Sequence, residues 1–257
     1  GNVSENISTN GIIVEDKASA IDFEFATPNA TVNGLNTYTD AVDVKVTVKD
    51  LEVSSGIKSI KYWVEVDGEK YHEYESFNFT IADPTFDQLV FEKVVDLVIT
   101  PVEGAAKNYI LHVEVVDNAE NTFTDSREVI IDTLDTQIGV KFDGTKNDRA
   151  LEGYFTSRTA TITFQERADL FDKNAAVESI SVYAYDVNGE GDKIARGENT
   201  YTVTWISETA ADNGDTIYTA EVKFIAEANY KFDINYTNLA TRNSKYDSTT
   251  DANATEG

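Results

Sequence analysis

The chain has 257 residues, a hydrophobic fraction of 41% and a formal net charge of −25 at pH 7. This length suits two domains with packed cores, and this charge disfavours nucleic acid and anionic membrane surfaces as partners. The absence of cysteine excludes disulfides, thiol nucleophiles and thiolate metal sites. Because no run of about 18 apolar residues occurs, we also expect no membrane insertion.

Alternation of apolar and polar residues predicts short β-strands along most of the chain. In the first half the alternating segments are Ala20–Phe25, Val42–Val48, Ile60–Val66, Phe77–Ile81, Leu89–Ile99, Tyr109–Val116 and Val129–Asp132. Turn residues separate the segments, notably at Asp67-Gly68 and Asp117–Asn121. Helical periodicity is nearly absent, so we expect only short helical turns near residues 84–89 and 168–176.

The second half of the chain repeats the order of the first half. The corresponding pairs are Ala20–Phe25 with Gln137–Phe142, Val42–Val48 with Thr159–Phe164, Ile57–Val66 with Val177–Asp186, and the turn after Val116 with Tyr236–Asn243. Short strands with turns at this spacing are typical of antiparallel sandwiches rather than of a parallel sheet. We therefore predict a flexible lead-in at 1–19, sandwich domains at 20–133 and 134–246, and a linker or tail at 247–257 that leads to a further module.

Four stretches resemble the bacterial Ig-like domains that occur in tandem in large Gram-positive surface proteins. They are the D-x-A-G-N type turn Asp117–Asn121, the strand end Ile130–Thr133, and the stretches Tyr154–Arg167 and Tyr230–Ala240. The chain departs from that pattern where Glu120 and the Thr241-Arg242 region replace the turn glycine and where Asn238 replaces aspartate. The resemblance implies an all-β fold of two tandem antiparallel Ig-like β-sandwich domains. It also implies a non-catalytic module at the bacterial surface, either a spacer or a binder of host protein or glycan.

Catalytic residues are not marked out by this sequence. The two histidines, His72 and His112, lie beside neither a serine nor a second histidine in a catalytic spacing. A zinc site would need more nitrogen or sulfur ligands, and no carboxylate pair is set apart as a glycosidase pair would be. We therefore expect the protein not to be an enzyme.

Calcium is the one cofactor that the carboxylates at the domain joint suggest. Asp132, Asp135 and Asp143 lie in or beside the joint, and Asp117 lies in the turn that precedes the last strand of the first domain. Calcium prefers six to eight oxygen ligands, which carboxylates and carbonyls supply. The alternative is that these are linker carboxylates turned to solvent.

The aromatic residues divide between the two faces of their strands. Trp63 shares a face with Lys61 and Glu65, away from the apolar Tyr62 and Val64. On the corresponding strand of the second domain, Tyr183 and Tyr185 lie opposite Ile180, Val182 and Ala184, whereas Trp205 aligns with Tyr201 and Val203 toward a core. We predict that Trp63, Tyr183 and Tyr185 are substantially exposed and form the contact surface for a partner. The alternative is that they are ordinary single exposed aromatics.

The resemblance to bacterial Ig-like domains implies an extracellular bacterial surface-protein fragment, which we expect to be monomeric within a tandem array. Its expected role is adhesion or binding of a host factor, either a protein such as an immunoglobulin or a glycan. One alternative is a pure structural spacer. Another is an accessory module of a secreted carbohydrate-active enzyme.

Overall fold

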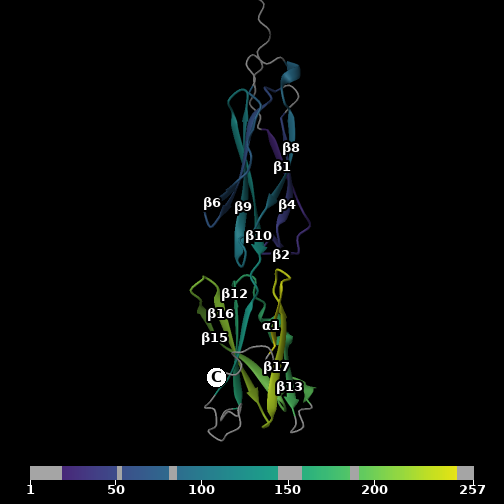
Figure 1. Ribbon diagram of the computed structural model, residues 1–257, viewed down its shortest axis with the longest axis vertical. Coiled ribbons are helices and arrows are strands. Elements are labelled where there is room, and N and C mark those ends of the chain that lie inside the picture. The colour runs from purple at the N-terminus through teal and green to yellow at the C-terminus, as the bar shows by residue number, and fades with distance from the viewer. Residues whose placement is uncertain (1–18, 51–53, 81–85, 144–157, 186–190, 248–257) are drawn as a thin grey trace, which may run out of the picture. The chain divides into compact units, whose positions relative to one another are not determined.

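The computed structural model describes residues 19–50, 54–80, 86–143, 158–185 and 191–247 (Figure 1). Within these residues the protein is all-β, with antiparallel sheets and two short helical elements. The chain divides into two compact units, one containing residues 1–28, 40–102 and 107–131, the other residues 29–39, 103–106 and 132–257. The predicted lead-in, the tail, the start of the Tyr154–Arg167 stretch and residue Ile81 fall outside the described residues.

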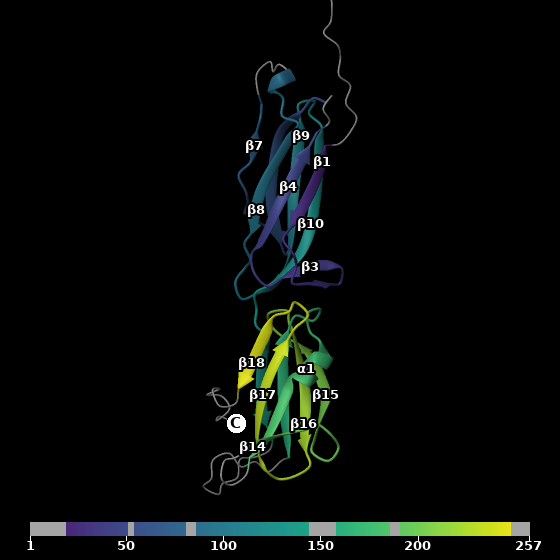
Figure 2. The same cartoon turned by 90° about the vertical axis from the view of Figure 1, so that its right-hand side faces the viewer.

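The first half of the chain forms two sheets (Figure 2). Its strands are β1 Ala20–Phe25, β2 Ala30–Val32, β3 Leu35–Tyr38, β4 Val42–Lys49, β5 Ile57–Val66, β6 Glu69–Glu73, β7 Phe77–Asn78, β8 Glu92–Ile99, β9 Ala106–Asp117 and β10 Thr122–Asp132. One sheet has the order β1-β4-β8 and the other has the order β2-β3-β10-β9-β5-β6, with β7 pairing to β5.

The alternating residues of these strands build the core of the first unit. The four valines of β4 are buried, and so are Ile60, Tyr62 and Val64 of β5. On β9, Tyr109, Leu111, Val113 and Val115 are buried in the same way. One buried face per sheet is the pattern of two packed β layers, so the predicted inward faces of β4, β5 and β9 are confirmed here. The strand predicted at Phe77–Ile81 is shorter than expected, because β7 spans only Phe77–Asn78.

The second unit contains two further four-stranded sheets. Its strands are β11 Gln137–Phe142, β12 Thr159–Glu166, β13 Ile180–Tyr185, β14 Gly191–Ile194, β15 Tyr201–Ala210, β16 Thr216–Phe224, β17 Asn229–Thr237 and β18 Asn243–Asp247. The sheet orders are β11-β12-β16-β15 and β14-β13-β17-β18. Ile162, Phe164 and Val222 from the first sheet form one core cluster with Phe232 and Ile234 from the second. Trp205 packs against this cluster, as its position on the strand predicts.

Helical structure differs from the expectation in one place. Helix α1 spans Lys173–Ser179, so the strand predicted to start at Val177 starts only at Ile180. The Asp172 Oδ1 accepts hydrogen bonds from the backbone N–H groups of Asn174 (2.8 Å) and Ala175 (3.2 Å), which caps the helix. A 3₁₀ turn at Phe86–Gln88 agrees with the helical turn expected near residues 84–89. No helix in the described part of the chain is long and apolar enough to cross a membrane.

The same turn closes the last hairpin of each half. Asp117 N–H donates to the Asn121 carbonyl at 3.1 Å, and Asn238 N–H donates to the Arg242 carbonyl at 3.0 Å. The fourth residue of each turn has a positive φ, 69° at Glu120 and 67° at Thr241. Glycine adopts this backbone region most easily, so the position that carries glycine in the resembled D-x-A-G-N turn keeps its conformation here.

Candidate functional site

Trp63 lies on the outer face of β5, as the alternation predicts, but it is only partly exposed. Its partner across the sheet is His112 of β9, whose ring stacks on the indole with ring centroids 5.0 Å apart and an interplanar angle of 7°. The Lys70 ammonium lies 5.5 Å from the ring centroid, and the indole N–H donates to Glu65 Oε1 at 3.4 Å. The expectation that Trp63 is substantially exposed is therefore wrong, because neighbouring side chains cover much of the ring.

Tyr183 and Tyr185 lie on the outer face of β13 and are also only partly exposed, so the expectation of substantial exposure is wrong for them too. The Lys231 ammonium lies 4.3 Å from the centroid of the Tyr185 ring. Gly191 pairs with Tyr185 across the sheet, and a Cβ on Gly191 would lie 2.5 Å from the ring. The Tyr185 ring thus lies close over the backbone of Gly191 and also contacts the Lys231 cation.

The histidines take part in aromatic contacts. His72 is exposed on β6 and meets the Tyr74 ring edge-on, with centroids 4.5 Å apart. The His112 Nε2 lies 3.2 Å from Glu65 Oε2. The described contacts of the two histidines are thus with aromatic rings and with Glu65.

A buried network of carboxylates and one amide forms in the second unit. Asp132 ends β10, and Glu166 ends β12; both side chains are fully buried. The Asn238 Nδ2 donates to Asp132 Oδ2 at 2.7 Å and to Glu166 Oε2 at 3.1 Å. One amide therefore bridges two buried carboxylates and satisfies part of their hydrogen bonding.

Further donors complete the hydrogen bonding of this network. Leu134 N–H donates to Asp132 Oδ1 at 3.1 Å, Arg167 N–H to Glu166 Oε1 at 2.9 Å, and the Thr136 hydroxyl to Glu166 Oε2 at 2.6 Å. The Asn238 Oδ1 accepts from Arg242 N–H at 2.9 Å, which fixes the amide orientation. Every carboxylate oxygen of the pair thus accepts at least one hydrogen bond, as a stable buried polar network requires.

Burial raises the pKa of the Asp132 carboxyl, because loss of water disfavours the charged form. The hydrogen bond from Asn238 and the charge of Arg242 oppose this effect. Burial likewise raises the pKa of Glu166, and the nearby Asp132 charge adds to the rise. We call this network of Asp132, Glu166 and Asn238 the carboxylate clasp, and its charge state depends on pH.

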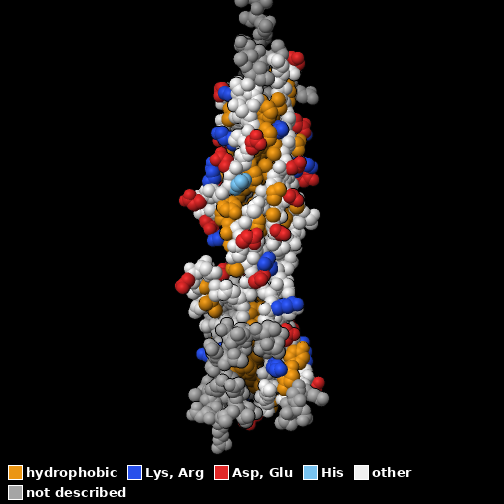
Figure 3. Space-filling model, in the orientation of Figure 1, with side chains coloured by type: hydrophobic (Ala, Val, Ile, Leu, Met, Phe, Trp, Pro, Cys, Tyr) orange, Lys and Arg blue, Asp and Glu red, His pale blue; other side chains and the backbone are white. Residues whose placement is uncertain are grey.

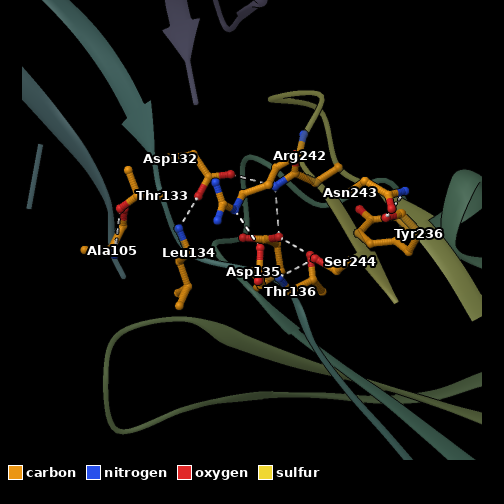
Figure 4. Close-up of polar contacts among 12 residues, drawn as sticks. Ala105, Asp132, Thr133, Leu134, Asp135, Thr136, Tyr236, Arg242, Asn243 and Ser244 are labelled. Atoms are coloured by element: carbon orange, nitrogen blue, oxygen red, sulfur yellow. Dashed lines mark hydrogen bonds and ion pairs between the residues drawn. The ribbon is translucent and has the colours of Figure 1, made fainter. Parts of the chain in front are cut away.

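The predicted calcium ligands are not assembled as a set. Asp135 is exposed and accepts from Arg242 Nε at 2.8 Å, and the Arg242 side chain lies close to Asp132 and Asp135 (Figure 4). Asp117 ends β9 at the turn, whereas Asp132 ends β10, so they lie at opposite ends of one hairpin. The expectation that Asp117 joins Asp132 is wrong for this reason.

Elsewhere the acidic groups have hydrogen-bond partners of their own. Asp117 accepts from Asn121 N–H and Nδ2, each at 2.8 Å, and Asp143 accepts from the Thr161 hydroxyl at 2.9 Å. In the described ranges no three His, Asp or Glu side chains are placed to hold a metal ion. Calcium binding stays a prediction to be tested in solution.

Glu166 and Asn238 were not predicted as one site, although a signal for Glu166 is present. It shares the inward parity of Ala160, Ile162 and Phe164 on β12, and a carboxylate on a buried face demands a partner. Which residue is that partner depends on the β17–β18 turn, which is distant in sequence.

No protein-family model matches the chain, and a search of curated proteins finds no match. The resemblance to bacterial Ig-like domains therefore rests on the residues named above.

Proposed function

We propose that the chain is a non-catalytic part of an extracellular bacterial surface protein, built of tandem Ig-like sandwiches. The two matching turns support this proposal. Asp117–Asn121 and Asn238–Arg242 share their backbone hydrogen bonds and a positive φ at the position of the family glycine. Each half of the chain also has its own antiparallel sheets.

The proposed role is attachment to a host protein, such as an immunoglobulin, or to a glycan. One observation carries this role: corresponding strands of the two halves each present an aromatic ring with a lysine over it. Trp63 with Lys70 is the first pair, and Tyr185 with Lys231 is the second. A half-exposed aromatic with a fixed polar neighbour supplies contact area at a small entropic cost, which suits partner recognition.

Binding to immobilised protein tests this proposal, using host secretions, purified immunoglobulin and a glycan array. Trp63→Ala should weaken binding about thirtyfold if Trp63 is an anchor of about 2 kcal/mol. Ile206→Ala is the matched control, because Ile206 is 56% exposed on another sheet and should change nothing. Unchanged affinity in Trp63→Ala and in the double variant Tyr183→Ala/Tyr185→Ala would reject these aromatics as the contact surface.

A spacer role is the first alternative, and an accessory role beside a carbohydrate-active enzyme is the second. The spacer role predicts no retained partner from any of the three sources. The accessory role predicts binding to polysaccharide on the array and no binding to immunoglobulin.

A further inference from the structure

An aromatic strip runs beside β5 in the first unit. It consists of Tyr71, Tyr74, Phe77 and Phe79, and we call it the aromatic seam. Tyr74 N–H donates to the Tyr62 carbonyl at 3.0 Å, Phe77 pairs with Ile60, and Phe79 N–H donates to the Lys58 carbonyl at 2.7 Å. These partners on β5 are two residues apart, so the three aromatic positions follow one another at intervals of about 6–7 Å.

The seam is partly exposed to solvent, and Tyr71 is its most exposed residue. Tyr71 is 43% exposed, and Tyr74, Phe77 and Phe79 are partly exposed. The Phe77 and Phe79 rings stack with centroids 6.2 Å apart, and the Tyr74 hydroxyl donates to the Val98 carbonyl of β8 at 2.7 Å. Strand β7 lies at the left margin of Figure 2, the side that faces the viewer in Figure 3, where an apolar band runs along this unit between charged groups.

Carboxylates lie within the seam segment and on the nearby β8. Glu73 and Glu75 are exposed in the segment itself, and Glu73 Oε2 lies 3.3 Å from Lys70 Nζ. On the outer face of β8, Glu92 Oε1 lies 3.5 Å from Lys49 Nζ, and Asp96 is also exposed there. The Lys93 ammonium lies 4.2 Å from the Phe77 ring centroid, so this ring face accepts a cation within the molecule itself. Together with a net charge of −25, these groups favour the approach of a cationic partner.

We propose that the aromatic seam binds an extended, basic peptide segment of a partner protein. Apolar side chains of the peptide pack on Phe77 and Phe79, and its Lys or Arg side chains lie near Glu73 and Glu75. Lys93 occupies the cation position in the free protein and is displaced by the peptide. This surface is distinct from Trp63 and does not depend on the outer-face aromatics.

The first test uses an acetylated, fluorescent ten-residue peptide of alternating Lys and Val, with a Glu–Val peptide as its counterpart. Anisotropy should show binding of the Lys–Val peptide that weakens as salt rises, and no binding of the Glu–Val peptide. Glu75→Lys should weaken binding about tenfold or more, whereas Glu128→Lys should change it less than about twofold. The two variants carry the same net charge, and Glu128 lies on β10, which β9 separates from β5 in the sheet.

A second set of variants distinguishes the seam from the Trp63 surface. Phe79→Ser should weaken binding about tenfold, Lys93→Ala should strengthen it, and Trp63→Ala should leave it unchanged. Circular dichroism and thermal melting confirm that each variant is folded. Absence of binding, equal losses in Glu75→Lys and Glu128→Lys, a loss confined to Trp63→Ala, or array binding of a glycan that Phe79→Ser abolishes would each overturn the proposal.

Discussion

Thr241 occupies a backbone conformation that side chains with a Cβ rarely adopt. Its φ is 67°, and a β-branched residue is especially disfavoured there. Replacing Thr241 by glycine should therefore stabilise the second unit by about 1 kcal/mol, net of the greater freedom of glycine in the unfolded chain. Chemical denaturation measures this change.

Glu120 is the comparison for Thr241, because its φ is 69° in the equivalent turn. Glu120→Gly should stabilise the protein less than Thr241→Gly. It removes the ion pair with Lys58, and it relieves less backbone strain because glutamate is not β-branched. A loss of stability in both variants would show that these turns are not strained.

Tyr62 has a fully buried hydroxyl that makes no hydrogen bond with the described residues. Burial raises the pKa of this phenol, which therefore stays neutral, and its ring meets Phe77 edge-on. Tyr62→Phe should stabilise the first unit by about 1 kcal/mol, because it removes an unsatisfied polar group without leaving a large cavity. A destabilised variant in denaturant titration would mean that the hydroxyl is solvated in solution.

Among the described residues, Asn238 is the only one that donates hydrogen bonds to both buried carboxylates, Asp132 and Glu166. Asn238→Asp replaces this amide by a third carboxylate and should destabilise the second unit by about 3 kcal/mol or more in chelator. Calcium should restore part of that loss in the variant. Melting curves with and without calcium measure both effects.

The control for this substitution is Asn229→Asp, which makes the same change at an exposed end of β17. It should melt like the unmodified protein. If the unmodified protein itself melts higher in calcium, a cation site like the one predicted for the joint is present. A variant at Asn238 that is as stable as the unmodified protein would contradict the bridging role of the amide.

Strand β12 places Glu166 at its inward-facing end, and this position makes stability depend on pH. The pKa values of Glu166 and Asp132 are raised in the folded protein. At pH values between the unfolded-state pKa values and the raised folded-state pKa values, the folded protein binds more protons than the unfolded protein. The stability that this pair contributes is therefore fully present below the unfolded-state pKa values, and it is lost as pH rises through the folded-state pKa values.

Glu166→Gln removes the Glu166 part of this dependence. Compared with the unmodified protein, the variant should be relatively most stable near neutral pH, and this relative stability should decrease as pH falls toward 4. Urea titrations at a series of pH values measure the difference. A difference that does not change with pH would show that Glu166 titrates normally.

The register of the first strand pair is the same in the two halves of the molecule. Ala20 pairs with Lys49 in the first half, and Gln137 pairs with Gln165 in the second. Asp50 and Glu166 therefore occupy corresponding positions, and both are buried. A carboxylate at the end of this strand is thus a feature of the repeat rather than of one unit.

At the scale of the whole molecule, each half carries its own sheets and its own buried residues. Fragments 1–132 and 132–257 should each unfold cooperatively and show β-type circular dichroism. Asp132 belongs in both fragments because it ends β10 and also accepts from Asn238. If one fragment is unfolded while the full chain folds, the two halves are not independent domains.

The sequence by itself determined the strands and the direction of their side chains. Period-two alternation is local, so the buried valines of β4, the outward position of Trp63 and the turns at Asp117 and Asn238 could be predicted. The helical turn was predicted near residues 168–176, but α1 spans Lys173–Ser179. The Asp172 cap starts the helix, which therefore takes residues from Val177 onward that the alternation had assigned to a strand.

Only the tertiary structure decided which residues meet. Asp132, Glu166 and Asn238 come together because three strand ends converge, although they span more than a hundred positions of the chain. The exposure of Trp63 depends on its cross-strand neighbour His112, and the aromatic seam depends on how the segment after β6 runs beside β5. Strand periodicity contains no information about cross-strand partners, because register and sheet order are set by long-range packing.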